Sequence, residues 1–245
     1  IILSSVFNKF FIVFFMSFFE WLATINRKCD NQYIRKIAEL YEAEISRLAK
    51  FQLIERLRQI PHIEIEALLP KSGKILDVGA GRGGFAAYAS LKSEARLIFG
   101  IETYKKRFND GLKIMPKLKN FVMLDCDIDE LLVKNEKFDA VLLMDILHHN
   151  KYEDQKKIIE KIYKLLVDNG KVILLEPGDY PKFRYFLIWL YDYLFYFLTM
   201  PTRQYRSEKE WTDFFENLKF TKKYSTQITN RGFFFTRKIM VFEKL

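Results

Sequence analysis

The sequence predicts an α/β domain built on a mostly parallel β-sheet and preceded by a helical extension. Short, almost continuously apolar segments alternate with segments of helical periodicity from Lys74 onward, which is typical of a parallel sheet covered on both faces. A glycine-rich turn directly follows the first apolar segment. Near the end, two strand-like segments flank Asn230-Arg231-Gly232, so we expect a hairpin that adds an antiparallel strand.

Residues 1–69 are expected to form the N-terminal helical extension, followed by one domain at 70–245. Residues 31–60 carry apolar side chains at helical spacing, and Pro61 and Pro70 interrupt the passage to the domain.

An uncharged apolar run, FFIVFFMSFF, occupies residues 10–19 within the apolar segment 1–25. It is shorter than the roughly 20 residues that a membrane-spanning helix needs. Two interpretations stay open for it: a helix lying at a membrane surface, and a helix packed on the domain.

The elements of the domain are predicted in chain order from their apolar patterns. Strands are expected at 74–79, 96–102, 120–125, 138–145, 171–176, 221–229 and 234–243, and helices at 84–91, 103–116 and 151–167. Asn150 and Glu153 have the spacing of a capping box before the third of these helices. Ser207 and Glu210 form a second capping box, before an amphipathic helix that contains Trp211, Phe214, Phe215 and Leu218.

The composition excludes few partners. A net charge of +9 and a pI of about 9.3 would suit nucleic acid, an anionic membrane or an acidic substrate. The lysines are spread along the chain without a long block of like charge, so we favour a lysine-rich surface and do not expect a nucleic-acid partner. Cys29 and Cys126 offer neither a disulfide framework nor zinc-ligand spacing, which fits a cytoplasmic protein.

The glycine-rich turn matches two patterns. Gly79, Gly81 and Gly84 satisfy G-x-G-x-x-G, the dinucleotide-binding fingerprint. Asp77, Gly79, Gly81 and Gly83 satisfy D-x-G-x-G-x-G, which occurs in enzymes that bind a methyl donor. Both patterns place a nucleoside against a tight backbone turn at the end of a strand, so the glycines alone do not decide between the two cofactors.

Of three acidic residues near strand ends, Asp77 and Asp127 favour the methyl donor, and Glu102 suits either cofactor. Glu102 could accept hydrogen bonds from ribose hydroxyls in either cofactor. A carboxylate at Asp77 would face a pyrophosphate unfavourably, yet it can hold a positively charged amino group. Asp127 can accept a hydrogen bond from an adenine amino group, or it can simply cap the following helix.

The whole series resembles the class I S-adenosylmethionine-dependent methyltransferases. ILDVGAGRGG, GIE, DCDIDEL and FDAVLLMDILHH match the first four motifs in order, and LLVDNGKVILLEP resembles the motif of the fifth strand. The resemblance covers roughly 70–245. It implies a Rossmann-like fold with a seven-stranded, mostly parallel sheet and an antiparallel last strand, and S-adenosyl-L-methionine as the cofactor. A nicotinamide-dependent dehydrogenase is the weaker alternative.

The resemblance also assigns roles to individual residues. It implies that the methionine part is held by Asp77 and by the backbone of Gly79, Ala80 and Gly81, in a turn that Gly83 completes. It implies that Glu102 binds the ribose, with Thr103 beside the adenine, and that Asp127 and Ile128 contact the adenine. Met144 and Asp145 are implied to line the sulfonium side. The family's metal-dependent members carry Asp-Asn after the fifth strand, where this chain has Glu176-Pro177, so no metal is expected.

His148 and His149 follow the fourth strand at the mouth of the predicted site. Methylation of a hydroxyl or an acidic carbon requires removal of a proton, and an imidazole titrates near neutral pH. Adjacent helical residues point about 100° apart, so we expect at most one of the two to face the acceptor. The alternative is that both merely shape the start of the next helix.

Residues 178–206 occupy the place where the family carries its acceptor cap. Between 185 and 201 the only charged residue is Asp192. Such an aromatic stretch predicts a small, hydrophobic or lipid-like acceptor methylated on oxygen or carbon. It could also contact a membrane peripherally, together with residues 1–25, or pack as a buried cap.

Two rival functions stay open from the sequence. The first is an RNA or protein methyltransferase, which only the high pI and basic-aromatic segments such as YKKRF at 104–108 favour. The second is a non-catalytic accessory protein at a membrane that binds the cofactor. We expect a cytoplasmic protein, with membrane association as an open possibility.

Overall fold

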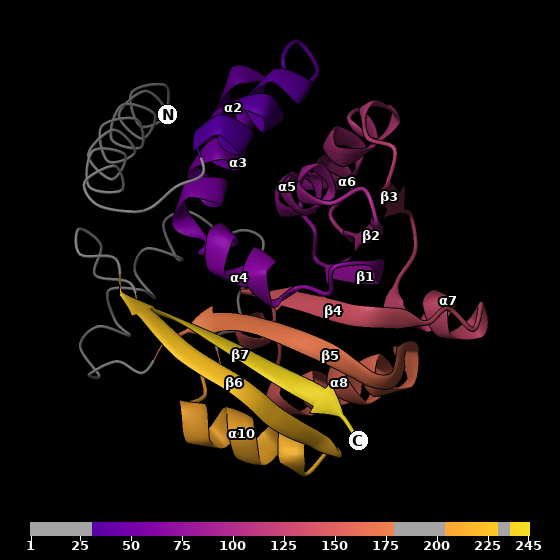
Figure 1. Ribbon diagram of the computed structural model, residues 1–245, viewed down its shortest axis with the longest axis vertical. Helices are drawn as coiled ribbons and strands as arrows, with labels where there is room; N and C mark the ends of the chain where they lie inside the picture. The colour runs from indigo at the N-terminus through magenta and orange to yellow at the C-terminus, as the bar shows by residue number, and fades with distance from the viewer. Residues whose placement is uncertain (1–30, 179–203, 230–235) are drawn as a thin grey trace, which may run out of the picture.

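The computed structural model describes residues 31–178, 204–229 and 236–245, which form a seven-stranded sheet with helices on both faces (Figure 1). The strands are β1 (Gly73–Val78), β2 (Arg96–Ile101), β3 (Phe121–Leu124), β4 (Phe138–Met144), β5 (Leu166–Pro177), β6 (Phe220–Thr229) and β7 (Thr236–Lys244). They are ordered β3-β2-β1-β4-β5-β7-β6. β1 to β5 pair in parallel, and β7 is antiparallel to both β5 and β6. The predicted fold class is confirmed.

The strands are continuously apolar because both faces of the sheet are buried. Alternate residues of each strand point to opposite faces, so Ile75 of β1 belongs to one core and Leu76 and Val78 belong to the other. β4 and β5 divide in the same way. Because β1 to β5 pair in parallel, their carboxyl ends lie at the same edge of the sheet. The predicted site residues lie at or just after these ends.

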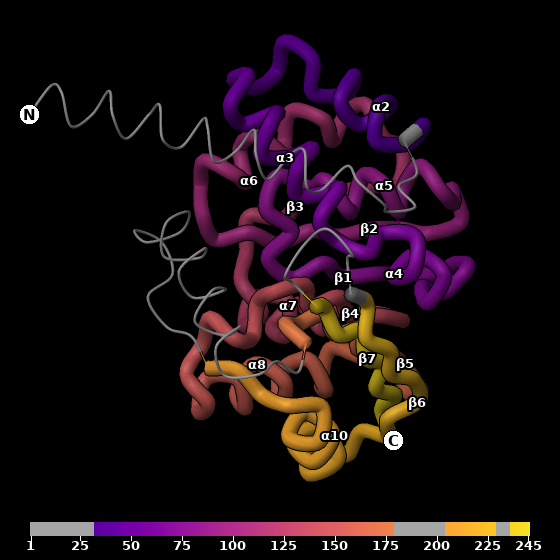
Figure 2. Tube along the Cα trace, turned by 90° about the vertical axis from the view of Figure 1, so that its left-hand side faces the viewer, coloured from indigo at the N-terminus to yellow at the C-terminus, as the bar shows by residue number. Residues whose placement is uncertain are grey.

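The helices sort onto the two faces by chain position. One core is covered by α2 (Asn31–Leu40), α3 (Arg47–Gln59), α4 (His62–Leu68), α5 (Gly84–Lys92) and α6 (Lys105–Leu112), and the other by α7 (Ile128–Val133), α8 (Tyr152–Leu165) and α10 (Glu208–Glu216). Figure 2 shows α2, α3, α5 and α6 together, with α10 at the opposite end of the molecule. The extension thus forms part of one helical layer.

The extension is more finely divided than its periodicity predicts. Residues 31–60 form two helices, and Ser46 starts the second one because its hydroxyl accepts a hydrogen bond from the Ala49 amide at 3.2 Å. A further helix, α4, lies between Pro61 and Pro70, within the helical extension expected at 1–69. The expected helix at 103–116 is likewise divided, into α6 and the 3₁₀ turn η1 (Met115–Lys117).

One predicted capping box is confirmed and the other is wrong. The Ser207 side chain accepts a hydrogen bond from the Glu210 amide at 3.3 Å, while the Glu210 carboxylate accepts one from the Ser207 amide at 2.7 Å. At the other site α8 begins at Tyr152 with Lys151 as its N-cap. The side-chain amide of Asn150 instead donates to the Ile146 carbonyl at 2.8 Å, because it closes the preceding 3₁₀ turn η2 (Leu147–His149).

Three sequence predictions lie outside the described residues: the apolar segment 1–25, most of the cap at 178–206, and the hairpin turn at 230–232. Within the described ranges, none of the helices combines the length and the apolar character that a membrane crossing requires.

We predict that Ser207→Ala lowers the free energy of unfolding by about 1 kcal/mol, because it removes the hydroxyl that accepts a hydrogen bond from the Glu210 amide and donates one to the Glu210 carboxylate. Urea unfolding followed by circular dichroism measures the change. Lys209→Ala, in the exposed first turn of the same helix, is the matched control and should shift stability by less than about 0.5 kcal/mol. Equal effects of the two substitutions would contradict the capping role.

Candidate active site

The turn between β1 and α5 depends on its glycines. Gly79, Gly81 and Gly83 have φ of 69°, 60° and 78°, in the left-handed region that other residues rarely adopt. A Cβ on Gly79 would lie 2.3 Å from Ile146 Cδ1, and a Cβ on Gly83 would lie 2.7 Å from Phe121 Cζ. The turn is therefore held between the loop after β4 and the side chains of β3.

Asp77 lies in β1, directly before this turn, and is 1% exposed. Neither of its carboxylate oxygens has a hydrogen-bond partner among the described residues. Burial above all, together with the nearby Glu102 carboxylate, raises the pKa of Asp77 to about 8, although the Arg56 guanidinium opposes the rise. Buried polar groups are nearly always partnered, so this carboxylate fits a site for a cationic ligand group.

Glu102 follows β2 and lies across the turn from Asp77. One of its oxygens accepts a hydrogen bond from the Tyr104 amide at 2.8 Å, and the other lies 4.0 Å from the place where a Cβ on Gly81 would stand. The side chain of Thr103 is exposed beside it. The structure thus brings together the acid after β2, the glycine turn and Asp77.

Asp127 is the N-cap of α7. Its Oδ1 accepts a hydrogen bond from the Glu130 amide at 2.9 Å, and its side chain is exposed. Ile128 is half-buried against the core beneath α7. The helix-capping interpretation of Asp127 is therefore confirmed, and the adenine contacts of both residues stay a prediction.

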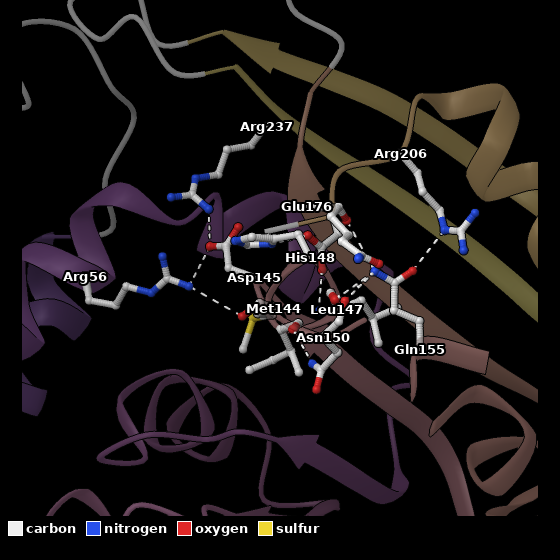
Figure 3. Close-up of polar contacts among 12 residues, drawn as sticks. Arg56, Met144, Asp145, Leu147, His148, Asn150, Gln155, Glu176, Arg206 and Arg237 are labelled. Atoms are coloured by element: carbon white, nitrogen blue, oxygen red, sulfur yellow. Dashed lines mark hydrogen bonds and ion pairs between the residues drawn. The ribbon is translucent and has the colours of Figure 1, made fainter. Parts of the chain in front are cut away.

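Asp145 is held by two arginines that come from distant parts of the chain (Figure 3). It follows Met144 at the end of β4 with φ of 56°. Its Oδ2 lies 2.6 Å from Nη2 of Arg56 on α3 and also pairs with Nη1 of Arg237 on β7. Burial alone raises the pKa of Asp145, but Arg237 and Arg56 outweigh burial and hold the pKa well below its usual range.

Sequence reasoning missed both arginines, because neither belongs to a local motif. Arg56 stands in a helix that precedes the domain predicted at 70–245, and Arg237 stands in the last strand. Only the folded chain places them on one carboxylate.

His148 and Glu176 form a buried pair in the loop after β4 and at the end of β5 (Figure 3). Nδ1 of His148 is hydrogen-bonded to Oε2 of Glu176, and Oε1 of Glu176 accepts a hydrogen bond from the Leu147 amide at 2.8 Å. Because a carboxylate only accepts, we assign the Nδ1 proton to the histidine. Sequence reasoning gave Glu176 no role. Its position at the carboxyl end of the fifth strand was the signal that could have marked it as a site residue.

Aromatic rings surround this imidazole. The Tyr205 ring is stacked on it, with 5.4 Å between centroids, and the His149 ring centroid lies 3.9 Å away. His149 itself is only partly buried. The two rings therefore lie against each other, and the histidines differ in burial; which of them faces the acceptor stays a prediction.

Gln155 ties the histidine loop to the residues that end the predicted cap (Figure 3). Its side-chain amide donates to the carbonyls of Leu147 at 3.0 Å and Gln204 at 3.2 Å, and its carbonyl accepts from Nε of Arg206 at 2.9 Å. The Gln204 amide donates in turn to the His148 carbonyl at 2.7 Å. The end of the 178–206 segment is thus fixed beside His148.

The strand order, the glycine turn after β1 and the acid after β2 together define the class I S-adenosylmethionine-dependent methyltransferases. Residues 34–223 match the methyltransferase domain family, so the chain belongs to this family. The matched segment includes α3, and with it Arg56 of the extension. A comparison with curated proteins finds no match.

Solved structures share the fold at low sequence identity. The 1,6-didemethyltoxoflavin-N1-methyltransferase of Burkholderia thailandensis, solved with 1,6-didemethyltoxoflavin and S-adenosylhomocysteine, is 18% identical with a TM-score of 0.58, and the match covers 75% of this chain and 76% of that one. Magnesium protoporphyrin IX methyltransferase of Synechocystis PCC 6803, solved with S-adenosylhomocysteine, is 12% identical with a TM-score of 0.59 over 99% of this chain and 100% of that one.

A third similar structure is an O-methyltransferase family 2 protein of Planctomyces limnophilus in complex with apigenin. It is 15% identical with a TM-score of 0.61, and the match covers 84% of this chain and 65% of that one.

We predict that Asp77→Asn changes the pH dependence of stability. The Asp77 carboxyl loses its proton near pH 4 in the unfolded chain and near pH 8 in the ligand-free folded chain. Between these values the folded state binds more protons, so Asp77 lowers the free energy of unfolding progressively as the pH rises from 4 to 8. The stability of Asp77→Asn relative to the wild type should therefore rise by about 1 kcal/mol or more between pH 5 and pH 8.

Urea unfolding of both ligand-free proteins at the two pH values measures this difference. Asp77→Asn should also bind S-adenosylhomocysteine at least about tenfold more weakly, because the ammonium group loses its anionic partner. A stability difference that does not change with pH would show that Asp77 is charged throughout in the folded protein.

Proposed function

We propose that this methyltransferase transfers a methyl group to an oxygen or an acidic carbon of a small, hydrophobic acceptor. The observation that carries the proposal is the buried pair of His148 and Glu176. His148 lies in the loop after β4, which packs on the glycine turn through Ile146, and Glu176 lies at the end of β5. A paired imidazole at that place suits an acceptor whose proton must leave during methyl transfer.

Each half of the reaction falls to different residues of the chain. S-adenosylmethionine supplies a methyl group already activated by a sulfonium. Asp77 and the glycine turn hold the methionine part and Glu102 holds the ribose, so their role is to position the methyl group. His148 removes the acceptor proton, and Glu176 is hydrogen-bonded to its Nδ1. Glu176 fixes the tautomer and stabilises the imidazolium that forms.

Two observations support a small and hydrophobic acceptor. Similar structures hold apigenin and 1,6-didemethyltoxoflavin, which are compact ring compounds. In this chain the sequence at 185–201 is aromatic, with Asp192 as its only charge, and it leads into the residues fixed beside His148. We further propose that residues 1–25 and 183–206 contact a membrane surface, a proposal that rests on their composition alone.

We predict that His148→Ala lowers kcat by about 10² to 10⁴-fold while the Kd for S-adenosylhomocysteine stays within about twofold. Glu176→Gln should lower kcat less and shift the pH-rate profile, because the amide still orients the ring but stabilises the imidazolium poorly. His149→Ala is the matched control and should leave kcat near the wild-type value. Full activity of His148→Ala would remove His148 as the base.

We predict that the protein labels the organic-extractable fraction of a lysate of its source cells when it is supplied with methyl-labelled S-adenosylmethionine. The organic, small aqueous, nucleic-acid and protein fractions are counted separately, with Asp77→Ala as the control for background. Label in RNA or protein would overturn the acceptor class. The absence of label from every fraction, together with intact binding of S-adenosylhomocysteine, would favour a non-catalytic binding protein.

A further inference from the structure

We propose that Arg56, on helix α3 of the N-terminal extension, binds the α-carboxylate of the methionine part of the cofactor. The extension would then supply the cationic half of a site for a zwitterion, and Asp77 would supply the anionic half. The inference rests on the use of S-adenosylmethionine and is independent of the acceptor.

The first support is that the extension packs directly on the cofactor turn. The Tyr41 hydroxyl donates a hydrogen bond to the carbonyl of Arg82, inside the turn. The Arg82 guanidinium donates to Gln52 on α3 at 3.3 Å. Gly84 lacks a side chain where Leu53 of α3 approaches, since a Cβ there would lie 2.6 Å from Leu53 Cδ1. The helix that carries Arg56 is therefore fixed against the turn that holds the methionine part.

The second support is the position of Arg56 between two acidic residues. Its Nη2 lies 2.6 Å from Asp145 Oδ2 and 3.5 Å from the Met144 carbonyl, at the end of β4. Its positive charge also reaches Asp77 at the end of β1, where it opposes the rise of the Asp77 pKa. β1 and β4 are neighbours in the sheet, so Arg56 spans the edge where the two strands end.

The third support is charge complementarity. A free α-amino acid group carries one ammonium and one carboxylate. Asp77 presents two buried oxygens without partners among the described residues, and these suit the ammonium. The carboxylate then needs a cation nearby, and the planar fork of a guanidinium matches a carboxylate in geometry. The Arg56 side chain is 36% exposed, so a ligand can reach it.

Arg237 explains how Arg56 could serve a ligand without leaving a buried charge unpaired. Asp145 Oδ2 is shared by both arginines, and the Asp145 side chain is 10% exposed. If Arg56 turns part of its fork to a ligand carboxylate, Arg237 still neutralises Asp145. Without the second arginine, such a movement would leave the buried Asp145 carboxylate without a cationic partner, which is strongly destabilising. Arg237 is thus a positioning residue in this arrangement.

The test compares two ligands that differ only in the carboxylate. Isothermal titration calorimetry on the full chain measures Kd for S-adenosylhomocysteine and for its decarboxylated analogue, which keeps the amine. We expect the wild type to prefer S-adenosylhomocysteine by at least about tenfold. Arg56→Met should reduce this preference to about twofold or less. Arg58→Met, two residues further along α3 and paired with Glu55, is the matched control and should keep the wild-type preference.

Two further variants make the result decisive. Asp77→Asn should weaken both ligands by a similar factor and keep the preference, because both ligands carry the amine. Arg56→Lys retains the charge and loses the fork, so it should show an intermediate preference, and it replaces Arg56→Met if the latter does not fold.

Equal weakening of both ligands by Arg56→Met, with the preference intact, would show that Arg56 only supports the loop and would overturn the proposal. Lack of preference in the wild type would overturn it too. Because no acceptor is present, a wrong acceptor class or a wrong base leaves these outcomes unchanged.

Discussion

The architecture of the site depends on one buried carboxylate without a hydrogen-bonding partner among the described residues. Asp77 stands at the end of the central strand β1, where packing on both faces excludes water. Folding alone would favour an apolar or amide side chain here, because an isolated charge in such a place is costly. The surrounding sheet tolerates the residue, and the glycine turn lies directly after it. The proposed binding of the ammonium group by Asp77 would thus exchange stability for affinity at one position.

The arginines on Asp145 extend this arrangement beyond the sheet. Arg56 belongs to a helix before β1, and Arg237 belongs to the last strand, yet both meet at the end of β4. The described part of the extension therefore packs as part of the domain, in agreement with the family match that begins within it. His148 lies in the loop that follows Asp145, so the residues proposed to position cofactor and acceptor share one segment of backbone.

Local patterns predicted the strands, the glycine turn and the Ser207 cap, because each depends on neighbours in sequence. The predictions that failed or were missing depend on contacts between distant residues. Asn150 has the spacing of a cap, but the 3₁₀ turn before it takes its side chain. Arg56 and Arg237 belong to no motif, and Glu176 ends the fifth-strand motif without a role of its own there; their contacts arise only when strands β4, β5 and β7 and helix α3 are brought together. Periodicity likewise could not locate the break between α2 and α3.

The insertion of β7 between β5 and β6 has a consequence for self-association. An apolar strand with a free edge invites pairing with another molecule. Here the apolar strand β7 is enclosed, and the outermost position falls to β6, which carries Lys222 and Lys223 and a register irregularity beside them. The opposite edge is β3, which is only four residues long. Both edge strands of the sheet are thereby poor templates for pairing with a strand of another molecule. The placement of β6 outside β7 thus disfavours aggregation through the sheet edge.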